Sequence, residues 1–126
     1  VGSEMCIRDR RYSARESALL WLRTYQYLKT NTPTAQNLAS LYEQTNVSFI
    51  RSGVSGDGEV EAVLNKAGWC SGSERFTGLC DAGLIKCTDG TTYLMSTMTN
   101  SPDGGLYTVR LANLASTLFE CRDVLE

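Results

Sequence analysis

Cysteine is the residue type in this sequence with the clearest capacity for chemistry. Four cysteines lie in the second half of the chain: Cys70, Cys80, Cys87 and Cys121. Zinc sites usually combine closely spaced cysteine pairs with histidine, and the sequence contains neither. An even set of cysteines in a small domain is typical of disulfides formed in an oxidising compartment. Disulfides are therefore the favoured interpretation, and free buried thiols or a metal site are the alternatives.

No constellation of catalytic residues is evident. The chain has no histidine, which removes Ser-His and Cys-His pairs, and no S-x-x-K motif that would supply a serine–lysine pair. The acidic residues Asp57, Glu59 and Glu61 fall where a glycine-rich loop meets a predicted helix, and negative charge is typical of a helix start. That loop, residues 51–59, lacks the motifs that bind phosphate. We therefore predict a protein that is not an enzyme and binds no cofactor or metal.

The first ten residues, VGSEMCIRDR, have neither helical nor strand periodicity and lack the apolar core of a signal peptide. Read backwards into codons as GTG GGC TCG GAG ATG TGT ATA AGA GAC AG, they resemble a transposon-end adapter used to prepare sequencing libraries. We interpret residues 1–10 as a non-native tail, with a natural disordered tail as the alternative, and residues 11–126 as one domain. Cys6 is then not a native cysteine, and the native N-terminus is expected upstream.

Composition and charge narrow the classes of partner. Hydrophobic residues make up 42% of the chain and charged residues 21%, as in ordinary globular proteins, and the net charge is −2. Such a weak, mixed charge does not favour nucleic acid or an anionic membrane surface as a partner. No apolar run reaches the ~18 residues that a membrane span needs.

The stretch from residue 11 to 30 predicts a long amphipathic helix. Its apolar residues recur at steps of three and four, which places them on one helical face. We expect this face to pack on a sheet or between subunits. Its main residues are Ala18, Trp21, Leu22, Tyr25 and Leu28.

The remaining elements follow from shorter patterns. Helices are predicted over 35–44, 59–67 and 115–126, with Gly68 just beyond the second of these. Short strands are predicted at 47–50 and 82–87. The clearest hairpin joins 91–99 to 106–114 through the turn NSPDGG at 100–105. Helices that precede strands indicate an α+β fold, in which an N-terminal amphipathic helix packs on a small antiparallel sheet and a short helix ends the chain.

Both ends of the domain resemble a type IV pilin or pseudopilin. RYSARESALLWLRTYQYLKT resembles the second, amphipathic half of the pilin helix, including its Y-x-x-R. GLYTVRLANLASTLFECRDVL resembles the late pilin strand and the cysteine-bearing terminal segment. The resemblance implies that Cys121 pairs with an upstream cysteine. It also implies that an apolar, membrane-inserted half-helix precedes Arg11.

The resemblance implies a structural subunit of a type IV pilus or secretion-like filament. Its partners would be copies of itself or other pilins, with the inner membrane as anchor before assembly, and it would function in adhesion, motility, uptake or secretion at the cell surface or in the periplasm. The alternatives are a stand-alone secreted or periplasmic binding module and, third, an enzyme. Of the three possible disulfide connectivities, we favour Cys70–Cys80 with Cys87–Cys121, although spacing alone does not fix the pairing.

Overall fold

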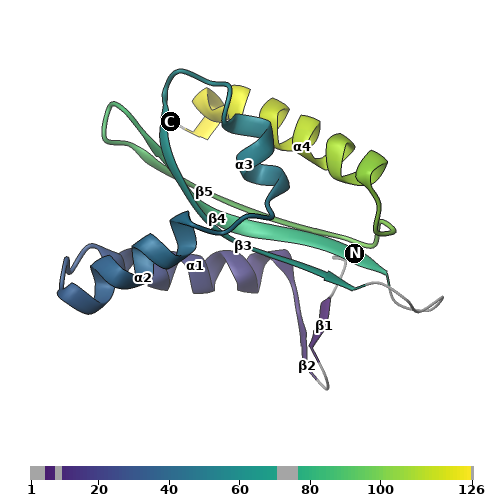
Figure 1. Ribbon diagram of the computed structural model, residues 1–126, viewed down its shortest axis with the longest axis horizontal. Coiled ribbons are helices and arrows are strands. Elements are labelled where there is room, and N and C mark those ends of the chain that lie inside the picture. The colour runs from purple at the N-terminus through teal and green to yellow at the C-terminus, as the bar shows by residue number, and fades with distance from the viewer. Residues whose placement is uncertain (1–4, 8–9, 71–76, 126) are drawn as a thin grey trace.

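The computed structural model describes residues 5–7, 10–70 and 77–125. Helices cover both faces of the main antiparallel sheet, with α1 and α2 on one face and α3 and α4 on the other (Figure 1). A separate antiparallel pair, β1 and β2, precedes α1. In chain order the elements are β1 (Met5–Ile7), β2 (Arg10–Tyr12), α1 (Ala14–Leu28), α2 (Pro33–Glu43), α3 (Phe49–Val54), β3 (Val60–Cys70), β4 (Gly78–Cys87), β5 (Thr92–Thr99), α4 (Gly105–Glu120) and the 3-10 helix η1 (Arg122–Leu125).

The main sheet has the strand order β3-β4-β5 among the described residues. Its register aligns Leu64 of β3 with Leu84 of β4 and Leu94 of β5. The central strand β4 is buried along nearly its whole length, because helices cover it on both faces. The outer strands β3 and β5 each pair on one side only in the part of the chain that the structure describes.

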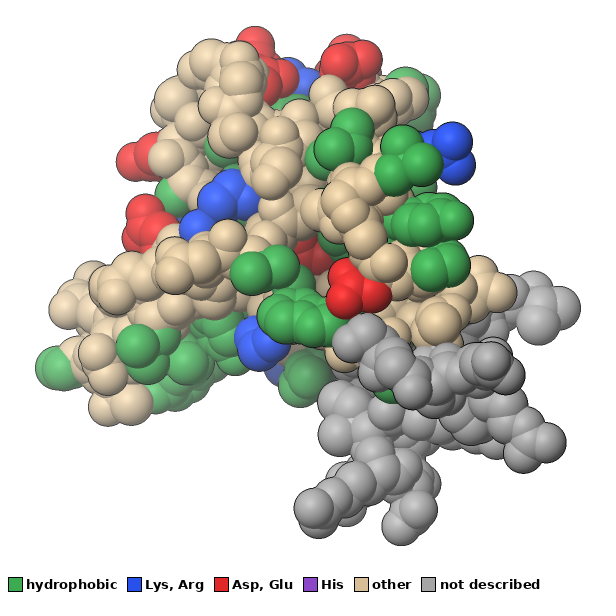
Figure 2. Space-filling view, turned by 45° about the vertical axis from the view of Figure 1, so that its right-hand side comes forward, with side chains coloured by type: hydrophobic (Ala, Val, Ile, Leu, Met, Phe, Trp, Pro, Cys, Tyr) green, Lys and Arg blue, Asp and Glu red, His purple; other side chains and the backbone are tan. Residues whose placement is uncertain are grey.

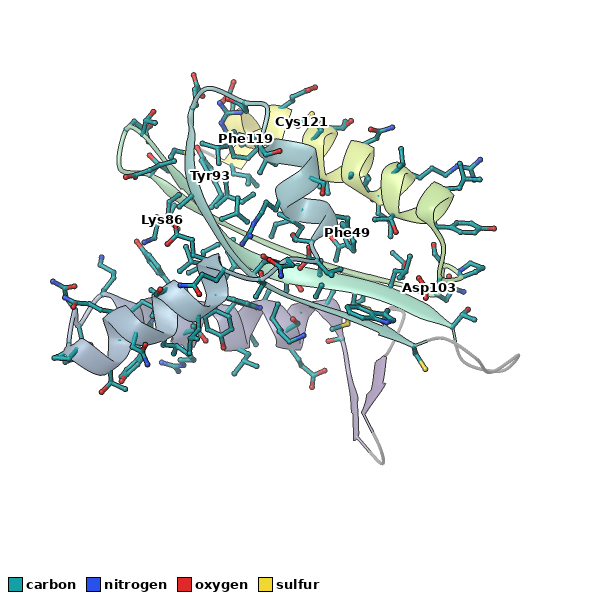
Figure 3. All side chains as sticks on the ribbon, viewed as in Figure 1. Phe49, Lys86, Tyr93, Asp103, Phe119 and Cys121 are labelled. Atoms are coloured by element: carbon teal, nitrogen blue, oxygen red, sulfur yellow. The ribbon has the colours of Figure 1, made fainter. Side chains whose placement is uncertain are left out.

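The alternation of side chains along the strands separates two apolar cores. On one face, Trp21 of α1 packs with Leu64, Ala82 and Leu84. On the other face, α3 and α4 cover a larger cluster, in which Phe49, Tyr93 and Phe119 lie between the helices and the sheet (Figure 3). Full burial of each large apolar side chain contributes about 1.5–3 kcal/mol, so the two cores hold helices to both faces.

The predicted helix over residues 11–30 is confirmed as α1, which begins at a capping box. The Ser13 hydroxyl accepts a hydrogen bond from the Glu16 amide, and the Glu16 carboxylate accepts one from the Ser13 amide. The predicted helix at 35–44 is confirmed as α2, with Thr32 as its N-cap and Pro33 at its first turn. The strand predicted at 91–99 is β5, and that at 82–87 is the second half of β4.

Three predicted elements are wrong. Residues 59–67, expected as a helix, form most of β3, and residues 47–50, expected as a strand, lead into α3. Residues 106–114, expected as the second strand of a hairpin, form the first half of α4. Strand β5 therefore pairs with β4, and helix α4 packs across the sheet. The α+β class is confirmed, with a different order of elements.

The α1 residues expected to pack together are not all buried. Trp21 is 6% exposed and packs against Tyr42 with ring centroids 4.9 Å apart. Ala18 is half-buried, and Tyr25 and Leu28 are half-buried at the edge of the same cluster. Leu22, in contrast, is 43% exposed. The interpretation of residues 1–10 as non-native stays a prediction, and β1 lies within that stretch.

Candidate functional site

Strand β3 carries an exposed lysine in the tripeptide Lys66–Ala67–Gly68. Lys66 lies two residues beyond Leu64, so its side chain leaves the sheet on the α1–α2 face. It is exposed, and its ammonium group donates a hydrogen bond to the carbonyl oxygen of Ala67. Ala67 is buried on the opposite face. The strand therefore presents one cation beside backbone groups that no described strand pairs on its outer side.

Directly before Lys66, the side chain of Asn65 enters a buried polar cluster on the other face. Asn65 is fully buried and Asp81 of β4 is 1% exposed. The Asn65 Nδ2 donates to Asp81 Oδ1 at 2.9 Å. The second carboxylate oxygen, Asp81 Oδ2, accepts from the Ser48 hydroxyl at 2.6 Å and from the Ile50 amide at 3.1 Å. Asp81 therefore connects β4 to the start of α3 and to β3.

Arg51 and Thr45 complete this cluster on the side of the loop between α2 and α3. Asn65 Oδ1 accepts from Thr45 Oγ1 at 2.6 Å and from Arg51 Nη2 at 3.0 Å. The same Arg51 nitrogen donates to the Val63 carbonyl at 2.7 Å, and Nη1 donates to the Thr45 carbonyl. In the part of the chain that the structure describes, no buried side-chain nitrogen or oxygen lacks a hydrogen-bond partner.

Burial raises the pKa of the Asp81 carboxyl above its usual range. Hydrogen bonds from Ser48, from Asn65 and from the Ile50 and Ala82 amides favour the ionised form and oppose this shift, but they do not cancel it. The carboxyl is thus a buried acid that is stabilised by neutral donors, while the Arg51 guanidinium reaches it only through Asn65.

A protein-family model described as the β-lactamase enzyme family matches residues 4–120 of the 126. The chain belongs to the β-lactamase enzyme family. A search of the curated proteins finds no significant match.

Membership of the β-lactamase family overturns the resemblance to pilins. An amphipathic helix, a small antiparallel sheet and a terminal helix are elements that unrelated α+β domains share, so they did not identify a family. The structural role in a filament, the pilin partners and the membrane anchor inferred from that resemblance are wrong. The alternative, a stand-alone binding module, is wrong for the same reason. The expectation that the protein is not an enzyme is also wrong for its family.

The lysine tripeptide is the feature that sequence reasoning missed. Class A β-lactamases and penicillin-binding proteins carry a K-T-G motif, together with S-x-x-K and S-D-N. This β-lactamase-family chain has Lys66–Ala67–Gly68, in which alanine replaces threonine, and neither serine motif occurs in the 126 residues. Because residues 59–67 were expected to be a helix ending near Gly68, the tripeptide was not placed on a strand. If these residues had been predicted as an edge strand, the tripeptide would have been recognised as a candidate site.

No disulfide joins Cys70, Cys80, Cys87 or Cys121 in the structure, where all four are free thiols. Cys70 pairs with Gly78 and Cys80 pairs with Gly68, which makes the two cysteines diagonal neighbours on adjacent strands. Such neighbours lie about 7–8 Å apart, beyond the usual reach of a disulfide. Cys87 is buried beside the α3–α4 core, whereas Cys121 is exposed where α4 ends (Figure 3). Pairing under oxidising conditions stays a prediction.

The surface gives few further indications of a ligand. Acidic and basic side chains are interspersed on the face shown in Figure 2, and neither positive nor negative charge covers it. Among the described residues, no cluster of three or more acidic or cysteine side chains could hold a metal ion. Within the same residues, no helix has both the length and the apolar character required to cross a membrane.

Proposed function

We propose that this domain contributes the lysine-bearing strand of a serine acyl-transfer site, one that binds β-lactams or related acyl-peptide substrates. The observation that carries the proposal is the exposed Lys66 on an edge strand, within a K-x-G tripeptide, in a chain of the β-lactamase enzyme family. The K-T-G motif of class A β-lactamases and penicillin-binding proteins has the same lysine and glycine.

The chemistry of β3 suits a carboxylate ligand with a neighbouring amide. The Lys66 ammonium offers three donors and a full positive charge to a carboxylate. The outer backbone groups of an edge strand can hydrogen-bond an extended ligand, as when a peptide adds to the side of a sheet. Ala67 lacks the hydroxyl that threonine would add, so recognition here depends on the lysine and the backbone.

The acyl-transfer step itself requires a nucleophile. In such a site a serine oxygen bonds to the substrate carbonyl, the amide C–N bond breaks, the nitrogen takes up a proton, and water later hydrolyses the acyl-serine. Neither serine motif of the family occurs in the 126 residues. We therefore assign substrate binding to Lys66 and to the β3 backbone of this β-lactamase-family domain.

The test is titration of the isotopically labelled 126-residue protein with benzylpenicillin, followed by amide chemical shifts. The amide chemical shifts of residues 66–69 should change and should saturate only at high benzylpenicillin concentration, with a Kd of about 1 mM or above. Lys66→Ala should abolish the effect. Lys29→Ala removes an equal charge at the end of α1 and should leave binding unchanged. Shifts confined to other elements, or equal binding by Lys66→Ala, would overturn the proposal.

The expected location in the periplasm or outside the cell stays a proposal, which rests on the even number of cysteines after residue 10 and not on a disulfide in the structure. Cell fractionation of the host that carries the gene tests it, and recovery in the cytoplasm would contradict it.

A further inference from the structure

We propose that Asn65 and Asp81 are positioning residues that lock the register of β3 and so fix the place from which Lys66 meets a ligand. The inference rests on the proposed function only in assigning a ligand to Lys66. The register lock itself depends on contacts within the domain.

Asn65 is held in one orientation by the chemistry of its partners. Its Oδ1 accepts from Arg51 Nη2, which can only donate, and from the Thr45 hydroxyl. Its Nδ2 faces acceptors, Asp81 Oδ1 at 2.9 Å and the Val47 carbonyl at 3.4 Å. A flipped amide would place N–H against the guanidinium and oxygen against the carboxylate. Asn65 therefore has a single arrangement in which every partner is satisfied.

The same cluster also hydrogen-bonds to the β3 backbone at a second point. Arg51 Nη2 donates to the carbonyl of Val63, two residues before Asn65. Arg51 belongs to α3, whose first turn is also held by Asp81 through Ile50. Strand β3 is thus hydrogen-bonded to α3 through the Asn65 side chain and the Val63 carbonyl. Helix α3 is in turn hydrogen-bonded to β4 through Asp81.

These ties matter because β3 is an edge strand. A shift of one residue in register moves every side chain of a strand to the opposite face. A shifted β3 would turn Lys66 toward α3 and α4 and would place Asn65 on the α1–α2 face, where Trp21 and Leu84 form an apolar cluster. Removal of Asn65 would take away the hydrogen bond to Asp81 Oδ1 and the hydrogen bond from Arg51 Nη2, inside a buried cluster, so the slipped register is strongly disfavoured.

A swap of the two polar groups separates a specific lock from general core packing. Asn65→Asp alone would place a second carboxylate against Asp81. Asp81→Asn alone is unfavourable in either orientation of the new amide. In one orientation its nitrogen faces the Ser48 and Ile50 donors, and in the other it faces Asn65 Nδ2. The double variant Asn65→Asp/Asp81→Asn restores a donor and an acceptor between positions 65 and 81, and it keeps an acceptor toward Thr45 and Arg51.

The experiment compares hydrogen exchange and Lys66 side-chain resonances in the full 126-residue chain at pH 7. In each single variant, β3 amides paired to β4 should exchange about tenfold faster or more, relative to α4 amides, and the Lys66 signals should move. The double variant should return both toward the wild-type values. Thr99→Val is the control, since it removes a hydrogen bond between the Thr99 side chain and the Leu79 carbonyl on the other edge of the sheet.

The outcomes are distinct. Equal acceleration in β3 and α4, unchanged Lys66 signals, or a double variant no better than the singles would overturn the register lock. If the exchange and Lys66 results are as expected but wild-type protein shows no benzylpenicillin shifts, the lock stands and the proposed ligand is wrong. Penicillin binding that survives a displaced Lys66 would show that the lock has no role in the site.

Discussion

Gly83 of β4 lies opposite Asn65 of β3, and the two backbones approach so closely there that no side chain fits between them. A Cβ at position 83 would lie 2.2 Å from the Leu64 carbonyl oxygen and 2.8 Å from the Asn65 Cα. Both obstacles are backbone atoms of the same strand, so β3 would have to move away from β4. The glycine is therefore part of the arrangement that holds Asn65 in place.

Gly83→Ala should destabilise the domain by about 1–3 kcal/mol, the usual cost of forcing extra atoms into a packed region. Urea denaturation with a fluorescence readout measures the change in the free energy of unfolding. Gly56→Ala is the matched control, because a Cβ at position 56 meets nothing within 4 Å. A Gly83 variant as stable as the Gly56 variant would show that β3 and β4 are not this close.

Trp21 is the main attachment of α1 to the sheet. Trp21→Ala should cost about 3–5 kcal/mol, because it removes a large side chain that is buried between Leu84 and Tyr42. Leu22→Ala should cost less than about 1 kcal/mol, since Leu22 is 43% exposed. Thermal unfolding of both variants makes the comparison. Similar losses would mean that α1 is rotated relative to the structure.

The errors of the sequence interpretation have a common physical origin. Val60, Val63, Leu64 and Ala67 are spaced as one helical face, but the same residues suit a strand that is covered by helices on both sides. Val63 packs toward α3 and α4, while its neighbour Leu64 packs toward α1. Only the tertiary arrangement decides between these two patterns.

Helix α4 presents the converse ambiguity. Tyr107, Val109 and Leu111 alternate as in a strand, yet Leu111, Ala115 and Phe119 are four residues apart and form the buried helical face. The capped helix α1 carried its own start signal in Ser13 and Glu16 and was predictable. The Asn65–Asp81 pair was not, because its members are 16 residues apart and meet only through strand register.

Deletion of residues 1–10 tests their interpretation as a non-native tail. Their deletion removes β1 and its pairing with β2. We predict a loss of less than about 1 kcal/mol in the free energy of unfolding, within the range of surface changes. A larger loss in thermal or urea unfolding would show that the hairpin supports the domain.

The cysteines should differ in reactivity toward a thiol reagent. Cys121 is exposed and should be labelled first, followed by the half-buried Cys70. Burial raises the pKa of the Cys80 and Cys87 thiols, which lowers their thiolate fraction and adds to their poor accessibility. Timed alkylation at pH 8 with peptide mapping gives the order. Unreactive Cys121 joined to Cys87 would instead reveal the disulfide that the sequence predicted.

The buried carboxyl of Asp81 should give the domain a specific pH dependence. Because its pKa is raised in the folded protein, the folded state binds this proton more tightly than the unfolded state. The resulting stabilisation is fully present below the ordinary value of 3.8 and is lost as the pH rises through the higher folded pKa. The stability of the wild type relative to Asp81→Asn should therefore decline as the pH rises above the ordinary value of 3.8 and through the higher pKa of the folded protein. Urea unfolding at a series of pH values measures this difference, and Thr99→Val, which changes no titrating group, should give a constant difference. A relative stability that is flat, or that grows with pH, would contradict a raised pKa at Asp81 and would indicate a carboxylate that is stabilised in its ionised form.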